Sequence, residues 1–176
     1  MNDSVIVLSI ASALVAGTPI LLAALGEIIT ERAGVMNLGV EGMMLMGAVA
    51  AFWCGVHTGS LPLALVVGGL AGAALSMVHA VLAITLRVNQ TVSGLSLVIV
   101  GTGLSAFLGA AGDTSLLARP NGVNVNQFFP DALADLPVAG PILFGHDVIV
   151  YLTVALVAVA GWVLYGTDTG LSLRAV

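Results

Sequence analysis

The chain has 176 residues, of which 59% are hydrophobic and only 7% are charged, and its mean hydropathy is +1.15. Soluble domains carry about a quarter charged residues, so this composition excludes an ordinary soluble protein. The formal net charge is −5 and the sequence contains no lysine, which excludes the basic surface that nucleic-acid binding requires. The single cysteine, Cys54, excludes an intrachain disulfide.

Five apolar stretches are long enough to cross a membrane, because a hydrocarbon core of about 30 Å needs roughly 20 helical residues. They cover residues 5–26, 35–56, 61–86, 88–112 and 148–165, and Glu41 is their one charged residue. The stretches are continuous, whereas barrel strands alternate between apolar and polar residues. We therefore expect an all-α polytopic membrane protein, a transmembrane helix bundle of about five spans that forms a single transmembrane domain over residues 1–176.

Polar residues and glycines interrupt the start of the second stretch. Asn37 and Glu41 are four residues apart and would share one face of a helix. Three nearby glycines lower the helix propensity, so a broken or re-entrant element is the alternative. A carboxylate within a span normally faces protein or a wet cavity. Glu41 is therefore expected either on a pathway or near the cytoplasmic interface, where it would cap the helix or pair with Arg32.

A second group of polar residues begins the fourth stretch. Asn89, Ser93 and Ser96 would fall on one helical face, with Gln90 beside them. Amide side chains both donate and accept hydrogen bonds, which suits sugar hydroxyls or the edge of a nucleobase. The same groups would also join neighbouring helices, and the residues alone favour that second interpretation.

Small residues recur every four positions in the third and fourth stretches. Two such rows are Ala64, Gly68, Gly72, Ser76 and Ala80, and then Gly101, Ser105 and Gly109. In lipid, rows of this kind let helix backbones approach closely. They predict helix–helix contacts but carry no chemistry.

Features of an enzyme or a metal site are missing from the sequence. The three histidines, His57, His79 and His146, do not show metal-ligand spacing. The sequence contains neither a Walker A motif nor a nucleophile elbow. We therefore expect no catalytic residues, no metal and no ATP hydrolysis by this chain.

The arginines indicate an orientation. If residues 5–26 enter from the outside, every arginine except Arg119 lies on the cytoplasmic side, as the positive-inside rule favours. Residues 113–147 then form an extracytoplasmic loop. Four prolines in this loop prevent a spanning helix, although its second half, which contains Phe128 and Phe129, could form a short helix on the outer interface.

Three blocks of the sequence resemble the inner-membrane permeases of ABC importers. The similarity is greatest to the branch that serves simple sugars and nucleosides, related to the ribose and branched-chain amino-acid permeases. The blocks are "LLAALGEIITERAGVMNLGVEGMMLMGA" at 21–48, "HAVLAITLRVNQTVSGLSL" at 79–97 and "YGTDTGLSLRAV" at 165–176. They follow the family order, and the chain stops within the third block. By this resemblance the chain looks like the N-terminal half of a permease.

The resemblance implies a transporter subunit that is not an enzyme and has no cofactor of its own. It would pass a nucleoside or a simple sugar through the bacterial cytoplasmic (inner) membrane by alternating access. A separate ABC ATPase subunit would bind and hydrolyse ATP, and a second permease subunit, identical or different, would complete the pathway. An extracytoplasmic substrate-binding lipoprotein or periplasmic protein would deliver the substrate, and membrane lipid would surround the spans.

The resemblance also assigns roles to individual residues. Residues 166–176 would begin the cytoplasmic coupling segment that docks on the ATPase, through Gly170, Leu171, Leu173, Arg174 and Ala175. The substrate pathway or its gate would include Asn37, Glu41, Asn89, Gln90 and Ser93. The alternative function is a passive channel or a structural membrane subunit without ATP coupling, which gives no reason for the "GLSLRAV" segment.

Overall fold

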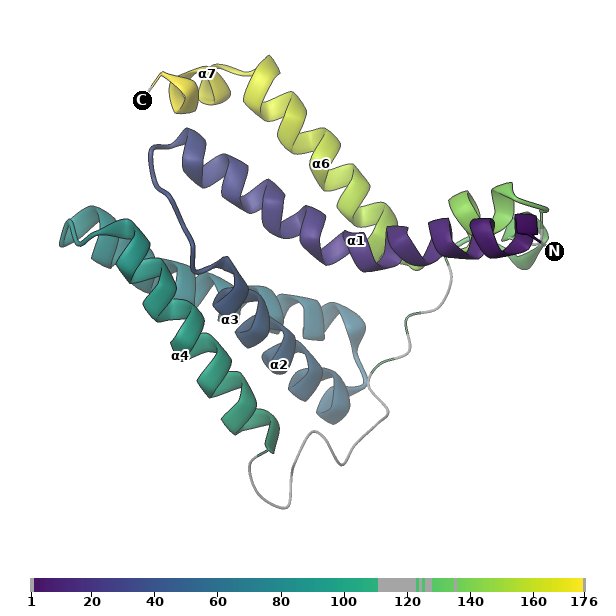
Figure 1. Ribbon diagram of the computed structural model, residues 1–176, viewed down its shortest axis with the longest axis horizontal. Coiled ribbons are helices and arrows are strands. Elements are labelled where there is room, and N and C mark those ends of the chain that lie inside the picture. Colours follow the sequence, from purple (N-terminus) through teal and green to yellow (C-terminus); the bar gives the residue numbers. More distant parts are fainter. Residues whose placement is uncertain (1, 111–122, 124, 126–127, 135, 176) are drawn as a thin grey trace. The chain divides into compact units, whose positions relative to one another are not determined.

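The computed structural model describes residues 2–110, 123, 125, 128–134 and 136–175. Over these residues the secondary structure is helical and contains no strand, and five helices are long and apolar enough to cross a membrane. The predicted all-α polytopic fold is confirmed (Figure 1). Contacts within the chain divide it into two compact units. The single transmembrane domain over residues 1–176 stays a prediction. The first unit is Met1–Ala33 with Val125–Val176, and the second is Gly34–Asn124.

The first unit is built on two long helices that pack against each other, α1 (Asn2–Arg32) and α6 (Val148–Gly166). Helix α1 extends beyond the apolar stretch that predicted it, because residues 27–32 are good helix formers or β-branched residues without a glycine or proline. At its end Arg32 donates to the Tyr165 hydroxyl of α6 over 3.4 Å. Its guanidinium carbon is also 6.0 Å from the centre of the tyrosine ring, so Arg32 connects the ends of both helices.

From Val125 onward, the described part of the predicted loop belongs to the same unit. It contains the short helix α5 (Asp131–Ala134) and a π-helical turn, η3 (Gly140–Phe144). The ring of Phe129 lies 5.1 Å from that of Phe128 and 5.2 Å from those of Phe144 and Tyr151. These edge-on contacts stabilise the segment before α6. Arg119, the exception to the positive-inside pattern, lies outside the described residues.

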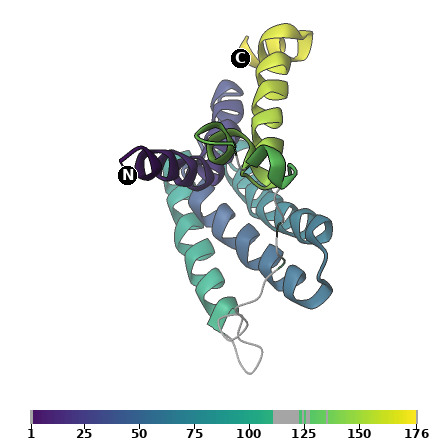
Figure 2. The same cartoon turned by 90° about the vertical axis from the view of Figure 1, so that its right-hand side faces the viewer.

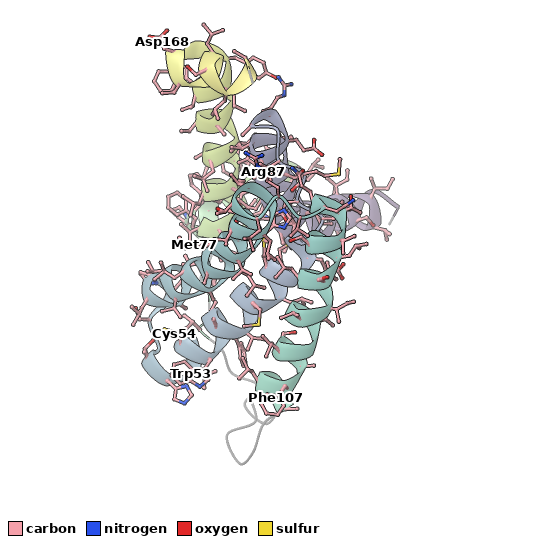
Figure 3. The ribbon with its side chains drawn as sticks, turned by 90° about the vertical axis from the view of Figure 1, so that its left-hand side faces the viewer. Trp53, Cys54, Met77, Arg87, Phe107 and Asp168 are labelled. Carbon is pink, nitrogen blue, oxygen red and sulfur yellow. The ribbon has the colours of Figure 1, made fainter. Side chains whose placement is uncertain are left out.

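The second unit contains three helices side by side (Figures 1 and 2). They are α2 (Val40–Thr58), α3 (Leu61–Ala80) with its π-helical continuation η1 (Val81–Thr85), and α4 (Gln90–Ala110). Helix α2 packs against both α3 and α4. The helices stay apolar on their outer surface, where Trp53, Met77 and Phe107 are exposed (Figure 3). Such exposure is expected of helices that face lipid.

The predicted rows of small residues mark the contacts within this unit. On α3, a Cβ atom added to Gly68 would lie 2.8 Å from both the Gly47 carbonyl oxygen and the Ala51 side chain of α2. On α4, Gly101 rests directly on the backbone of Gly42. Both glycines are buried. The close approach that their spacing predicted is confirmed at these two positions.

Candidate functional site

The chain leaves its helical conformation between α1 and α2. Residues 33–39 form turns and irregular backbone, and Gly34 has a φ of 79°, a left-handed conformation that glycine adopts without steric cost. Helix α2 begins only at Val40. Asn37 therefore precedes the helix and does not share a helical face with Glu41. The second apolar stretch is therefore broken, as the glycines suggested, and the break lies before α2.

Side chains from two other elements bind the backbone of this break. The Gln90 side-chain oxygen accepts a hydrogen bond from the Met36 amide over 2.8 Å. His79 Nε2 is 3.2 Å from the Met36 carbonyl oxygen. Because a carbonyl oxygen only accepts, Nε2 must carry the proton. The other ring nitrogen, Nδ1, is 3.1 Å from the Ser93 hydroxyl.

Asn37 stabilises the same break from within. Its side-chain oxygen accepts from the Gly39 amide over 3.0 Å, and its side-chain nitrogen is 3.4 Å from the Met43 sulfur. Asn37 is buried. The Asn37 side chain therefore provides a hydrogen-bond partner for a backbone amide that precedes the helix.

The two other predicted pathway residues lie at helix starts. The Asn89 side-chain oxygen accepts from the amides of Thr91 and Val92, at 3.0 and 3.3 Å, and so caps α4. Glu41 is exposed in the first turn of α2, where the helix dipole favours a carboxylate. The structure thus gathers Asn37, Gln90 and Ser93 at the break.

His79 is the member of this cluster that sequence reasoning missed. Metal-ligand spacing, which the three histidines lack, gives no information about hydrogen bonds to the backbone. The signal was nevertheless present, because a polar side chain in an apolar span needs a partner inside the protein. With 2% of its surface exposed, His79 is among the most buried residues of the chain.

A groove of about 670 Å³ opens elsewhere in the second unit, between α2 and α4. Its lining is almost entirely apolar and consists of Ala48, Val49, Phe52, Ser105, Ala106, Gly109 and Ala110. None of the residues predicted for the pathway lines it. An apolar groove of this kind offers few partners for the hydroxyl groups of a sugar.

The predicted coupling segment forms a short helix, α7 (Asp168–Arg174), directly after α6. The Thr167 hydroxyl caps it by accepting from the Gly170 amide over 3.2 Å, and donates to the Val163 carbonyl of α6 over 2.6 Å. Gly170 is buried against the last carbonyls of α6. These contacts fix the angle at which α7 leaves α6.

The remaining coupling residues differ in exposure. Leu171 is 60% exposed, Leu173 is half-buried, and Ala175 is exposed just after the helix. The side chain of Arg174 lies outside the described residues. Leu171 is thus an apolar side chain on a surface helix that also carries the exposed Asp168 (Figure 3).

The chain is similar to known transport proteins. The family model described as "branched-chain amino acid transport system / permease component" matches residues 9–176. A putative glucose ABC transporter permease protein of Haloferax volcanii is 42% identical over 92% of this chain and 49% of its own length. A guanosine ABC transporter permease protein of Bacillus subtilis is 34% identical over 99% of this chain and 57% of its own.

A nucleoside ABC transporter permease protein of Lactococcus lactis is 31% identical over 95% of this chain and 55% of its own. The chain therefore spans about half the length of the curated relatives it matches. No solved structure matches it significantly. With a family match that covers nearly all of its residues, the chain belongs to the family of permease components of branched-chain amino acid transport systems.

Proposed function

We propose that this chain acts in the permease subunit of an ABC importer in the cytoplasmic (inner) membrane of a bacterium. The observation that carries the proposal is the family match over residues 9–176. The substrate is a nucleoside or a simple sugar, which is supported by the names of relatives that carry glucose, guanosine or nucleosides. Transport proceeds by alternating access, with a second permease subunit and an extracytoplasmic binding protein as partners.

Energy enters through α7, which docks on a separate ATPase subunit that binds ATP. The exposed Leu171 supports this role, because an apolar side chain on a short helix fits the helix-in-groove mode of recognition. Gly170 and Thr167 attach α7 firmly to the end of α6. A movement of the ATPase would therefore be passed on to the span.

The gate is formed around the break between α1 and α2. Interrupted helices near substrate sites are frequent in transporters, and Asn37, Gln90 and Ser93 gather at this one. Glu41, exposed in the first turn of α2, and Asn89, at the start of α4, contribute polar groups to the pathway.

The coupling assignment is tested in the full permease, expressed together with its ATPase. Replacing both Leu171→Asp and Arg174→Ala is expected to weaken co-purification of the ATPase roughly 10- to 100-fold, since burial of a leucine contributes about 1.5–3 kcal/mol. ATP-driven uptake should fall with it. Ser172→Ala changes an exposed residue of the same helix and serves as the control.

Two results would contradict the proposal. Unchanged association in the double variant would exclude α7 as the docking segment. Substrate flux that is equally fast with and without ATP would favour a passive channel.

A further inference from the structure

We propose that His79 and Gln90 are positioning residues of the gate, which together clamp the backbone of Met36. The inference deepens the proposed transport function and rests on it. It concerns the Met36 clamp, defined as the side chains of His79, Gln90 and Ser93 with the backbone of Met36.

The clamp satisfies both backbone polar groups of one non-helical residue. The Met36 amide donates to Gln90 and its carbonyl accepts from His79, at 2.8 and 3.2 Å. Neither group has a partner in a helical turn, because residues 35–37 have no regular structure. Met36 is 47% exposed, whereas His79 and Ser93 are buried, so the histidine bonds the protected side of the break. Irregular backbone is therefore tolerated here because two side chains replace the missing helical bonds.

Histidine suits this position because its ring can form a hydrogen bond at each of its two nitrogen atoms. Nε2 donates to the Met36 carbonyl of the break, and Nδ1 forms a hydrogen bond with the Ser93 hydroxyl on α4. His79 lies in the last turn of α3, directly before the π-helix η1, a type of turn that is frequent at functional sites. One imidazole thus joins α3, α4 and the break, and leucine in its place would remove a partner from the buried Ser93 hydroxyl and from the part-buried Met36 carbonyl.

The position of the clamp along the chain indicates what it controls. The first compact unit ends at Ala33 and the second begins at Gly34. Gly34 has the left-handed backbone of a glycine turn, whereas Met36, two residues later, is bonded on both sides. On this proposal, bending between α1 and α2 is expected at residues 33–35. Alternating access needs such short hinges between rigid parts, and the clamp determines where this hinge ends.

The test uses the full permease with its ATPase and binding protein in proteoliposomes. His79→Leu and Gln90→Met remove the hydrogen bonds while keeping much of the side-chain volume, and His79→Gln restores a donor towards Met36. Ser96→Ala is the control, because Ser96 is exposed on α4 and bonds only within its own helix in the described contacts. Two quantities are measured, amide hydrogen exchange at residues 34–39 and the number of substrate molecules carried per ATP hydrolysed.

Both His79→Leu and Gln90→Met should speed exchange at residues 34–39 about tenfold, the change expected when one hydrogen bond that holds this backbone is lost. Transport per ATP should fall by a similar factor while ATPase association is unchanged. His79→Gln should return both quantities to within about threefold of the native values. A merely structural residue would lower the amount of folded protein without changing transport per ATP.

The proposal is overturned if exchange at residues 34–39 is unchanged in both variants, or if His79→Gln is as defective as His79→Leu. If the His79→Leu variant does not fold, hydrogen exchange and transport per ATP in the Gln90→Met variant test the proposal. Exchange needs neither substrate nor ATP. If the native protein shows protected amides at residues 34–39 but no ATP-driven uptake, the proposed function is contradicted, whereas the Met36 clamp is still supported.

Discussion

Buried polar residues in this chain are satisfied by hydrogen bonds, most of them to the backbone. Thr18 donates to the Leu14 carbonyl and Thr153 to the Ile149 carbonyl, each over 2.8 Å within its own helix. No buried side-chain nitrogen or oxygen among the described residues lacks a partner. The polarity of a residue in a span is thus a weak sign of a substrate site. Bonds between elements, such as those of His79 and Gln90, are more informative.

Gly170 allows α7 to lie close against the end of α6. A Cβ atom there would clash with the carbonyls of Val163 and Leu164, so Gly170→Ala should push α7 away from α6. Overpacking of this kind typically costs about 1–3 kcal/mol. We expect ATPase affinity to fall at least about fivefold, measured by titration of the ATPase onto the full permease.

Gly161→Ala provides the matched control, because a Cβ atom at Gly161 of α6 meets nothing within 4 Å. It should leave the affinity unchanged. Equal affinities for both variants would show that the Gly170 contact does not position α7.

Two features of the sequence specify the helices of the second unit. Their length and apolarity follow from composition, and their packing follows from small residues at a spacing of four. The π-helix η1 follows from neither. It depends on bonds such as that from the Leu86 amide to the Val81 carbonyl, over 2.9 Å, which form as the chain turns through Arg87 at a φ of 53°.

Contact between α2 and α4 is expected to depend on Gly101. Gly101→Ala would force a methyl group into the backbone of Gly42 and should destabilise the second unit by about 1–3 kcal/mol. Thermal unfolding in detergent would show this as a lower midpoint. Gly103→Ala, on the same helix but with nothing within 4 Å, should not change the midpoint. Equal midpoints would contradict the assigned contact.

At the scale of the whole molecule, the orientation in the membrane is the main remaining prediction. The positive-inside pattern places the N-terminus of α1 outside and α7 inside. The proposed docking of α7 on a cytoplasmic ATPase would require the same orientation.

Labelling of single cysteines tests this topology. In a Cys54→Ala background, His57→Cys should react with a membrane-impermeant maleimide on right-side-out vesicles. Leu86→Cys and Ser172→Cys should react only after the membrane is opened. All three positions are exposed within the protein, so access depends on the side of the membrane. The reverse pattern would contradict both the orientation and the coupling role of α7.

The sequence by itself determined the class of the protein, because apolar length and low charge leave a helix bundle as the stable arrangement in lipid. Its small residues also predicted the close contacts at Gly68 and Gly101, and its three blocks predicted the family. The bonds of Asn89 and Asn37 are local, since each side chain accepts from an amide two positions further along the chain. The bonds between elements needed the folded structure. His79 and Gln90 bind Met36 from 43 and 54 positions away, and local periodicity cannot specify such pairs.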